Sequence, residues 1–148
     1  MTEIAFHFNA ADRLDYLCRL LRKAVLAGAK VAVVGPAAAL SQLDAQLWAF
    51  SAPDFVPHCL QDSPSEVLAA SPVVLTTSAQ GLAHQQVLVN LGQEVAAGFE
   101  GFERVIEVVG LEEAQRQAAR ARWRHYTELG YAITRHDLVP KTLGQNPA

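Results

Sequence analysis

The residues best suited to bind another molecule are arginines in the last third of the chain. Arg116, Arg120 and Arg124 recur every four residues, and Trp123 lies beside them. Side chains four positions apart share one face of a helix, so this pattern predicts a basic stripe with an aromatic ring next to it. An arginine fork binds carboxylates in a bidentate manner, and an adjacent ring can hold an apolar side chain. The pattern fits an acidic peptide that ends in a bulky residue.

Two other interpretations of this stripe stay open. The arginines can form an ordinary solvated face, with Trp123 turned into the core and Arg122 off to the side of the stripe. One basic stripe with one aromatic ring can also bind single-stranded nucleic acid, but only weakly. The spacing alone therefore predicts an anion site without naming its ligand.

Large apolar residues form a second group around an irregular stretch. Trp48 follows a helical run of leucines, and Phe55, Val56 and Pro57 come soon after it. These residues either close one end of the core or, if they are exposed together, form an apolar patch. Exposed patches of this kind mark partner surfaces.

Motifs that carry catalysis or bind cofactors are absent from the sequence. The first two turns between a predicted strand and helix read HFNAADR and VVGPAAAL, with neither GxxxxGK[ST] nor GxGxxG. Pro36 also lacks the N–H that an anion site at a helix start uses. His84 lies near Ser78 outside a GxSxG elbow, and the five histidines show no HxxxH or HExxH spacing. We expect no catalytic residue, cofactor or metal ligand, and a nucleotide-binding α/β enzyme is the less favoured alternative.

The elements that must position these residues alternate between strands and helices. Apolar residues recur with a period of about two and then of about 3.6, first over residues 4–8 and then toward Ala27. Asn9 and Asp12 supply capping chemistry for this first helix, and Gly28 supplies its exit. Further strands are predicted at 30–34, 73–76, 87–91 and 104–109, further helices at 36–48 and 112–129, and extended pieces at 55–56 and 131–134.

This order predicts a three-layer α/β/α sandwich. Its sheet is expected to be mostly parallel and Rossmann-like, without a nucleotide-binding loop. We expect a single α/β domain over residues 1–138 and a flexible C-terminal tail over residues 139–148.

Composition limits the setting in which the chain works. Among 148 residues, 51% are hydrophobic, and 12 basic against 15 acidic side chains give a formal charge of −3. This balance argues against a protein that coats nucleic acid with its whole surface. Cys18 and Cys59 form no CxxC pair, and no apolar window is long enough to span a membrane. We therefore expect a cytoplasmic protein without membrane contact.

Two segments resemble a known family. QLDAQLWAFSAPDFVPH and FERVIEVVGLEEAQRQAARARWRHYTELGY are similar to segments of the chi subunit family of the bacterial DNA polymerase III holoenzyme. The similarity extends over nearly the whole chain in order, with residues 62–86 matched by length and pattern only. Trp123 replaces the more usual tyrosine of the family, and arginines stand where lysines are familiar.

The resemblance implies a noncatalytic accessory subunit of the clamp-loader assembly. Members of the family bridge the psi subunit to the acidic, phenylalanine-ended C-terminal tail of single-stranded DNA-binding protein during DNA replication. It also implies mainly indirect contact with DNA, and another replication or repair protein is an alternative partner in place of psi. By position, the resemblance assigns Trp48, Phe55, Val56 and Pro57 to psi binding, and Arg116, Arg120, Trp123 and Arg124 to tail binding.

Overall fold

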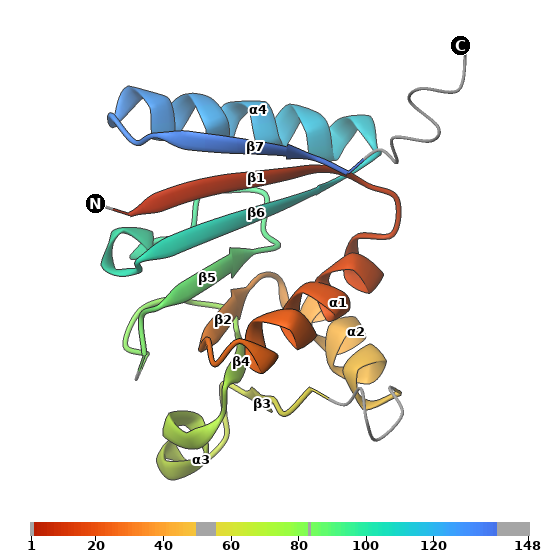
Figure 1. Ribbon diagram of the computed structural model, residues 1–148, viewed down its shortest axis with the longest axis vertical. Coiled ribbons are helices and arrows are strands. Elements are labelled where there is room, and N and C mark those ends of the chain that lie inside the picture. Colours follow the sequence, from red (N-terminus) through yellow and green to blue (C-terminus); the bar gives the residue numbers. More distant parts are fainter. Residues whose placement is uncertain (1, 50–55, 83, 139–148) are drawn as a thin grey trace.

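A seven-stranded sheet with helices on both faces forms the body of the protein (Figure 1). The computed structural model describes residues 2–49, 56–82 and 84–138. The strand order is β3-β4-β2-β5-β6-β1-β7, and every neighbouring pair is parallel. The strands are β1 (Glu3–Ala10), β2 (Val31–Val34), β3 (Cys59–Leu60), β4 (Val73–Thr76), β5 (Val87–Asn90), β6 (Arg104–Gly110) and β7 (Ile133–Asp137). The helices are α1 (Arg13–Leu26), α2 (Ala37–Trp48), α3 (Ser65–Ala70) and α4 (Glu113–Glu128), with a 3-10 turn η2 (Phe99–Gly101).

The predicted three-layer α/β architecture is confirmed, and its sheet is wholly parallel rather than mostly so. In Figure 1, α1 and α2 lie on one side of the sheet and α4 lies on the other. Each side has its own apolar core: Leu17 and Leu43 belong to the first, and Phe6 and Tyr126 to the second. All four residues of β2 are buried, as expected for a central parallel strand with both faces covered.

The first helix begins and ends close to its predicted bounds. The side chain of Asp12 accepts a hydrogen bond from the backbone N–H of Asp15 at 3.0 Å, so Asp12 is the N-cap of α1. Gly28 follows the helix with a φ of 84°. Asn9, which the sequence grouped with Asp12 as a cap, lies within β1 instead.

The middle of the chain holds two elements that the sequence did not predict, β3 and α3. Strand β3 has only two residues and pairs with β4, and α3 has six residues and buries none of them. Elements this short carry no hydrophobic period. Of the extended piece predicted at 55–56, Val56 lies outside any strand and Phe55 lies outside the described residues. The predicted tail, 139–148, lies outside them too.

Other boundaries differ by a few residues. Pro36 is the N-cap residue of α2 rather than part of its first turn. Strand β7 begins two residues after the predicted start and runs to Asp137. The apolar pattern did not predict its end, because most of its side chains are polar and exposed. No helix among the described residues is long and apolar enough to cross a membrane.

A buried ion pair fixes α4 to the sheet. Arg122 on α4 has 5% exposure and donates from Nε to the Glu107 carboxylate of β6 at 2.9 Å, and Glu107 is fully buried. Tyr126 (2.6 Å) and Asn90 (3.1 Å) donate to the other carboxylate oxygen, and the Arg122 guanidinium also donates to the Gln93 carbonyl at 2.8 Å. Burial raises the pKa of the Glu107 carboxyl, and Arg122 acts in the opposite direction. Three donors thus hold a carboxylate that water does not reach.

We expect Arg122→Met to destabilise the fold strongly. The substitution leaves the Glu107 carboxylate buried without its counter-charge, a change that costs about 3–5 kcal/mol in comparable cores. Urea titration would measure the free energy of unfolding. The added substitution Glu107→Gln should recover part of the loss, because it removes the buried charge.

Arg19→Met is the control for this experiment. Arg19 pairs with Asp15 on the exposed face of α1, and its loss should cost less than about 1 kcal/mol. Equal losses for the two single variants would contradict a stabilising role for the buried pair.

His7 is a second partly buried titratable group of the sheet. It lies on β1 beside His136 of β7, with 4.6 Å between the ring centroids, and its Nδ1 shares a hydrogen bond with the Tyr16 hydroxyl at 2.5 Å. Burial, with His136 and Arg104 nearby, lowers the pKa of His7 from 6.5 to about 4. The folded chain therefore holds His7 neutral in mildly acidic solution.

This shift predicts a pH-dependent contribution to stability. Between 6.5 and about 4, the unfolded chain binds a proton at His7 that the folded chain does not, so stability falls as the pH falls through this window. His7→Gln should remove that contribution and make the dependence shallower. Urea titrations near pH 7 and near pH 5, about two pH units apart, would compare the variant with the wild type. Identical pH dependence of the two proteins would show that His7 does not titrate in this way.

Candidate functional site

The rotation of α4 about its axis decides which side chains face the candidate site. Ala119, Arg122 and Tyr126 are its buried residues and face the sheet. A helix has 3.6 residues per turn, so the angle around its axis between two side chains can be calculated. Measured in one direction from Arg122, this angle is about 100° for Trp123, about 120° for Arg116 and about 160° for Arg120. These three residues therefore share one flank of the helix, away from the buried ion pair.

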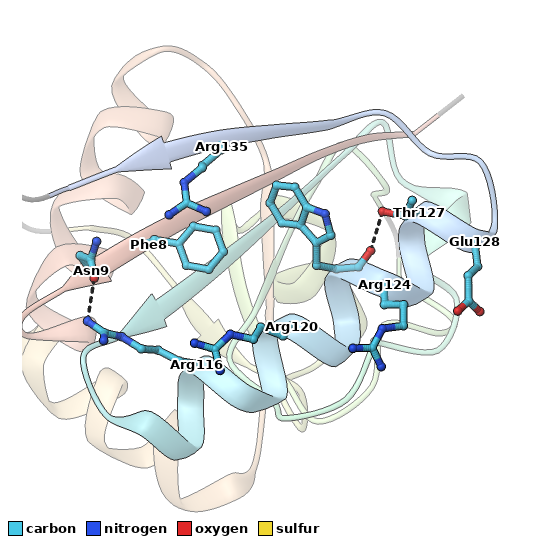
Figure 2. A pocket seen from close by; sticks show the side chains of 9 residues that line it. Phe8, Asn9, Arg116, Arg120, Arg124, Thr127, Glu128 and Arg135 are labelled. Carbon is cyan, nitrogen blue, oxygen red and sulfur yellow. Dashed lines mark hydrogen bonds between the residues drawn. The ribbon is translucent and has the colours of Figure 1, made fainter.

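That flank borders an open pocket of about 800 Å³ between α4 and the strands β1 and β7. Figure 2 shows the arginines of α4 along one side of the pocket, with Phe8 and Arg135 across from them. All four residues predicted for the anion site lie here. The lining residues are Phe8, Asn9, Arg116, Arg120, Trp123, Arg124, Thr127, Glu128 and Arg135.

Stacked aromatic rings form the apolar wall of the pocket. The Trp123 ring centroid lies 5.1 Å from that of Phe6 and 6.0 Å from that of Phe8. Phe6 is fully buried, while Trp123 is half-buried against the same core cluster. The Arg135 guanidinium lies 4.5 Å from the Phe8 ring centroid, a cation–π contact. One side of the indole is thus packed, and the pocket has a rigid apolar surface.

The arginines of α4 differ in their contacts. Arg116 donates from Nη2 to the side-chain oxygen of Asn9 at 3.0 Å. Arg120 forms an ion pair with Glu113 at 3.2 Å, and both side chains are more than 60% exposed. An exposed pair of this kind contributes little to stability, so an incoming carboxylate can replace Glu113 at small cost.

The charge of the pocket favours an anionic ligand. Four arginines and one glutamate line it. The one hydroxyl among the lining residues, that of Thr127, donates to the Trp123 carbonyl at 2.9 Å, and the lining includes no histidine, cysteine or lysine. These groups can bind carboxylates beside an apolar side chain, but they do not form a nucleophile with its base. Within the described ranges, no group of three or more metal-binding side chains occurs.

Comparison with known proteins agrees with the resemblance. The family model described as "DNA polymerase III chi subunit, HolC" matches residues 1–134. The chain belongs to the DNA polymerase III chi subunit family. The DNA polymerase III subunit chi of Pseudomonas aeruginosa is 37% identical over 143 residues, which span 93% of this chain and 98% of that protein. Membership of the chi family places the chain among the accessory subunits of a replicative polymerase.

The second surface that the chi family resemblance indicated is only partly displayed. Trp48, the last residue of α2, is 63% exposed, and Pro57 is exposed. Val56 is 1% exposed and packs in the core, so its side chain is not on the surface. Phe55 lies outside the described residues.

His58 connects this segment to α2. Its Nε2 lies 2.8 Å from a carboxylate oxygen of Asp44, and its Nδ1 lies 2.7 Å from the Val56 carbonyl. The Trp48 ring centroid is 5.4 Å from that of His58. A buried histidine thus supports an exposed tryptophan at the end of the helix.

Sequence reasoning missed the strand side of the pocket. Phe8 and Asn9 lie near the end of β1, far from α4 along the chain, and Arg135 lies on β7, the strand that follows α4. The sequence showed the alternation of Phe6 and Phe8 and the helix that became α4, but not that this helix covers that face of β1. Arg122 gave no signal of its role either, because an ion pair between a strand and the helix that follows it has no fixed spacing in the sequence.

Proposed function

We propose that the pocket on α4 binds the acidic C-terminal tail of single-stranded DNA-binding protein, and that the chain links this protein to the psi subunit of DNA polymerase III without catalysing a reaction. The observation that carries the proposal is the convergence of four arginines on one aromatic wall. The function implied by the family resemblance requires both features, a site for carboxylates and a site for a terminal phenylalanine.

The pocket suits such a tail chemically. Arg120 and Arg124 present guanidinium forks to aspartates and to the terminal carboxylate. Trp123 and Phe8 contact each other at a tilt and offer ring surfaces for a phenylalanine side chain. Aromatic rings favour offset or tilted contacts of this kind. Glu128 repels acidic groups at one end of the pocket, so a bound acidic peptide should have one preferred orientation. Several tails displayed on coated DNA would raise the effective concentration of a weakly bound peptide.

The other end of the proposed bridge is the surface around Trp48. Trp48 is exposed, and its ring contacts His58. Tryptophans in such positions are typical of residues that dominate an interface. We propose that the psi subunit, or another replication protein in its place, binds there in the cytoplasm. Pro57 adjoins this surface and Val56 supports it from the core.

Titration with a labelled acidic peptide that ends in phenylalanine tests the tail site. We expect binding that weakens about tenfold or more in Arg120→Gln and in Trp123→Ala, because a lost charged hydrogen bond or buried ring is worth at least about 1.4 kcal/mol. Arg19→Gln is the matched control, since it removes the same charge from α1 outside the pocket. The same peptide with a terminal alanine should bind weakly. No binding by the wild type, or tighter binding of a bare single-stranded oligonucleotide, would contradict the proposal.

Salt dependence tests the arginine mechanism separately. Charges on an exposed surface are screened, and the Debye length falls from about 30 Å at 0.01 M to about 10 Å at 0.1 M. Peptide affinity should therefore fall across this range, and the slope should be smaller for Arg120→Gln than for the wild type. Isothermal titration at several salt concentrations would measure it. An affinity that does not change with salt would rule out arginine–carboxylate pairing as the main source of binding.

A further inference from the structure

Asn9 has an unusual backbone conformation at the rim of the pocket. Its φ is 67°, and among the described residues it is the one non-glycine residue with a positive φ. Asparagine tolerates this left-handed conformation better than most residues. The pairing of β1 with β6 shifts register between His7 and Ala10, so Asn9 lies in a bulge near the end of β1.

The bulge determines the direction of the Asn9 side chain. Phe8 lines the pocket on the α4 face, so the next residue of a regular strand would point to the opposite face. A bulge changes this alternation and can redirect a side chain. Asn9 also lines the pocket and reaches Arg116 on α4, as Figure 2 shows.

The Asn9 amide connects two elements across the end of the pocket. Its Oδ1 accepts a hydrogen bond from Arg116 Nη2 at 3.0 Å, and its Nδ2 donates to a carboxylate oxygen of Asp137 on β7 at 2.8 Å. Arginine can only donate and an ionised carboxylate can only accept, so the partners determine the orientation of the amide. Asn9 is thereby held at both ends, and it holds Arg116.

We propose that Asn9 is a positioning residue that orients the Arg116 guanidinium toward an acidic ligand in the pocket. This inference rests on the proposed function. A free arginine side chain must lose rotamer freedom when it binds a carboxylate, and a side chain that is already held loses less. The amide is neutral, so it leaves the charge of Arg116 available to the ligand. Arg120, in contrast, is paired with the carboxylate of Glu113.

Two substitutions at position 9 separate positioning from support of the bulge. Asn9→Gly keeps the left-handed backbone without strain and removes the amide. Asn9→Asp keeps an acceptor for Arg116, but it replaces the donor to Asp137 with a second carboxylate and adds a charge that compensates the guanidinium; aspartate also tolerates the left-handed region. We expect Asn9→Gly to weaken binding of the acidic peptide by about three- to tenfold, in the lower part of the range of couplings between neighbouring side chains. Asn9→Asp should weaken it at least as much. Unchanged affinity in both variants would overturn the proposal.

A double-mutant cycle with Arg116→Gln identifies the route of the effect. If Asn9 acts through Arg116, Asn9→Gly has no further effect once Arg116 is replaced. Additive losses would mean that Asn9 does not act through Arg116. A wild type that fails to bind the peptide would overturn the proposed function itself, whereas a wild type that binds, with loss in Arg120→Gln but none in Asn9→Gly, would overturn the positioning role alone.

A measurement on the free chain keeps the inference testable without the ligand. In nitrogen NMR relaxation, the side-chain Nε–H of Arg116 should be ordered in the wild type and mobile in Asn9→Gly. Arg124 lines the same pocket and serves as the internal control, with no change expected. Equal mobility of Arg116 in the two proteins would show that Asn9 does not hold it.

Discussion

A carboxylate and a guanidinium with almost no access to water join β6 to α4, and the geometry of the pocket depends on them. Because Arg122 must reach Glu107, α4 has one allowed rotation against the sheet. The same rotation turns Trp123 onto Phe6 and directs the arginine stripe along the pocket. A helix held only by small apolar contacts could turn or slide with little loss of energy, and its arginines would lose their common direction. The buried ion pair of Arg122 and Glu107 thus determines the geometry of the pocket, although neither residue lines it.

The parts of the pocket differ in how well they tolerate substitution. Its aromatic wall belongs to the hydrophobic core, so a change at Phe6 or Trp123 alters packing and binding together. Arg120, Arg124 and Arg135 are exposed, and substitution of exposed side chains costs little stability. The charged side chains of the pocket can therefore change with little effect on the fold, whereas its ring surface is constrained by the core.

The sequence predicted those features that repeat along the chain. The helical spacing of Arg116, Arg120 and Arg124 and the β-branched run of β2 identify their elements directly, because each pattern lies within one element. Features formed by contacts between two elements escaped prediction. The Glu107–Arg122 pair joins residues 15 positions apart, and Asn9 contacts a residue 107 positions away. Asn9 was interpreted as a helix cap because asparagine is common at caps, and only the bulge in β1 distinguishes the two roles. The short elements β3 and α3 are stabilised by neighbours rather than by a pattern of their own.

The strand order also determines how far apart two bound molecules would be. The pocket adjoins β7 at one edge of the sheet, and His58, which contacts Trp48, directly precedes β3 at the other edge. Six inter-strand spacings of about 4.8 Å separate these edges, a distance of about 29 Å. That distance exceeds the Debye length of about 8 Å at physiological ionic strength, so the charge of a ligand at one edge has almost no effect at the other. For two such ligands the sheet would act as a rigid spacer, which would keep both on one small protein while each dissociates at its own rate.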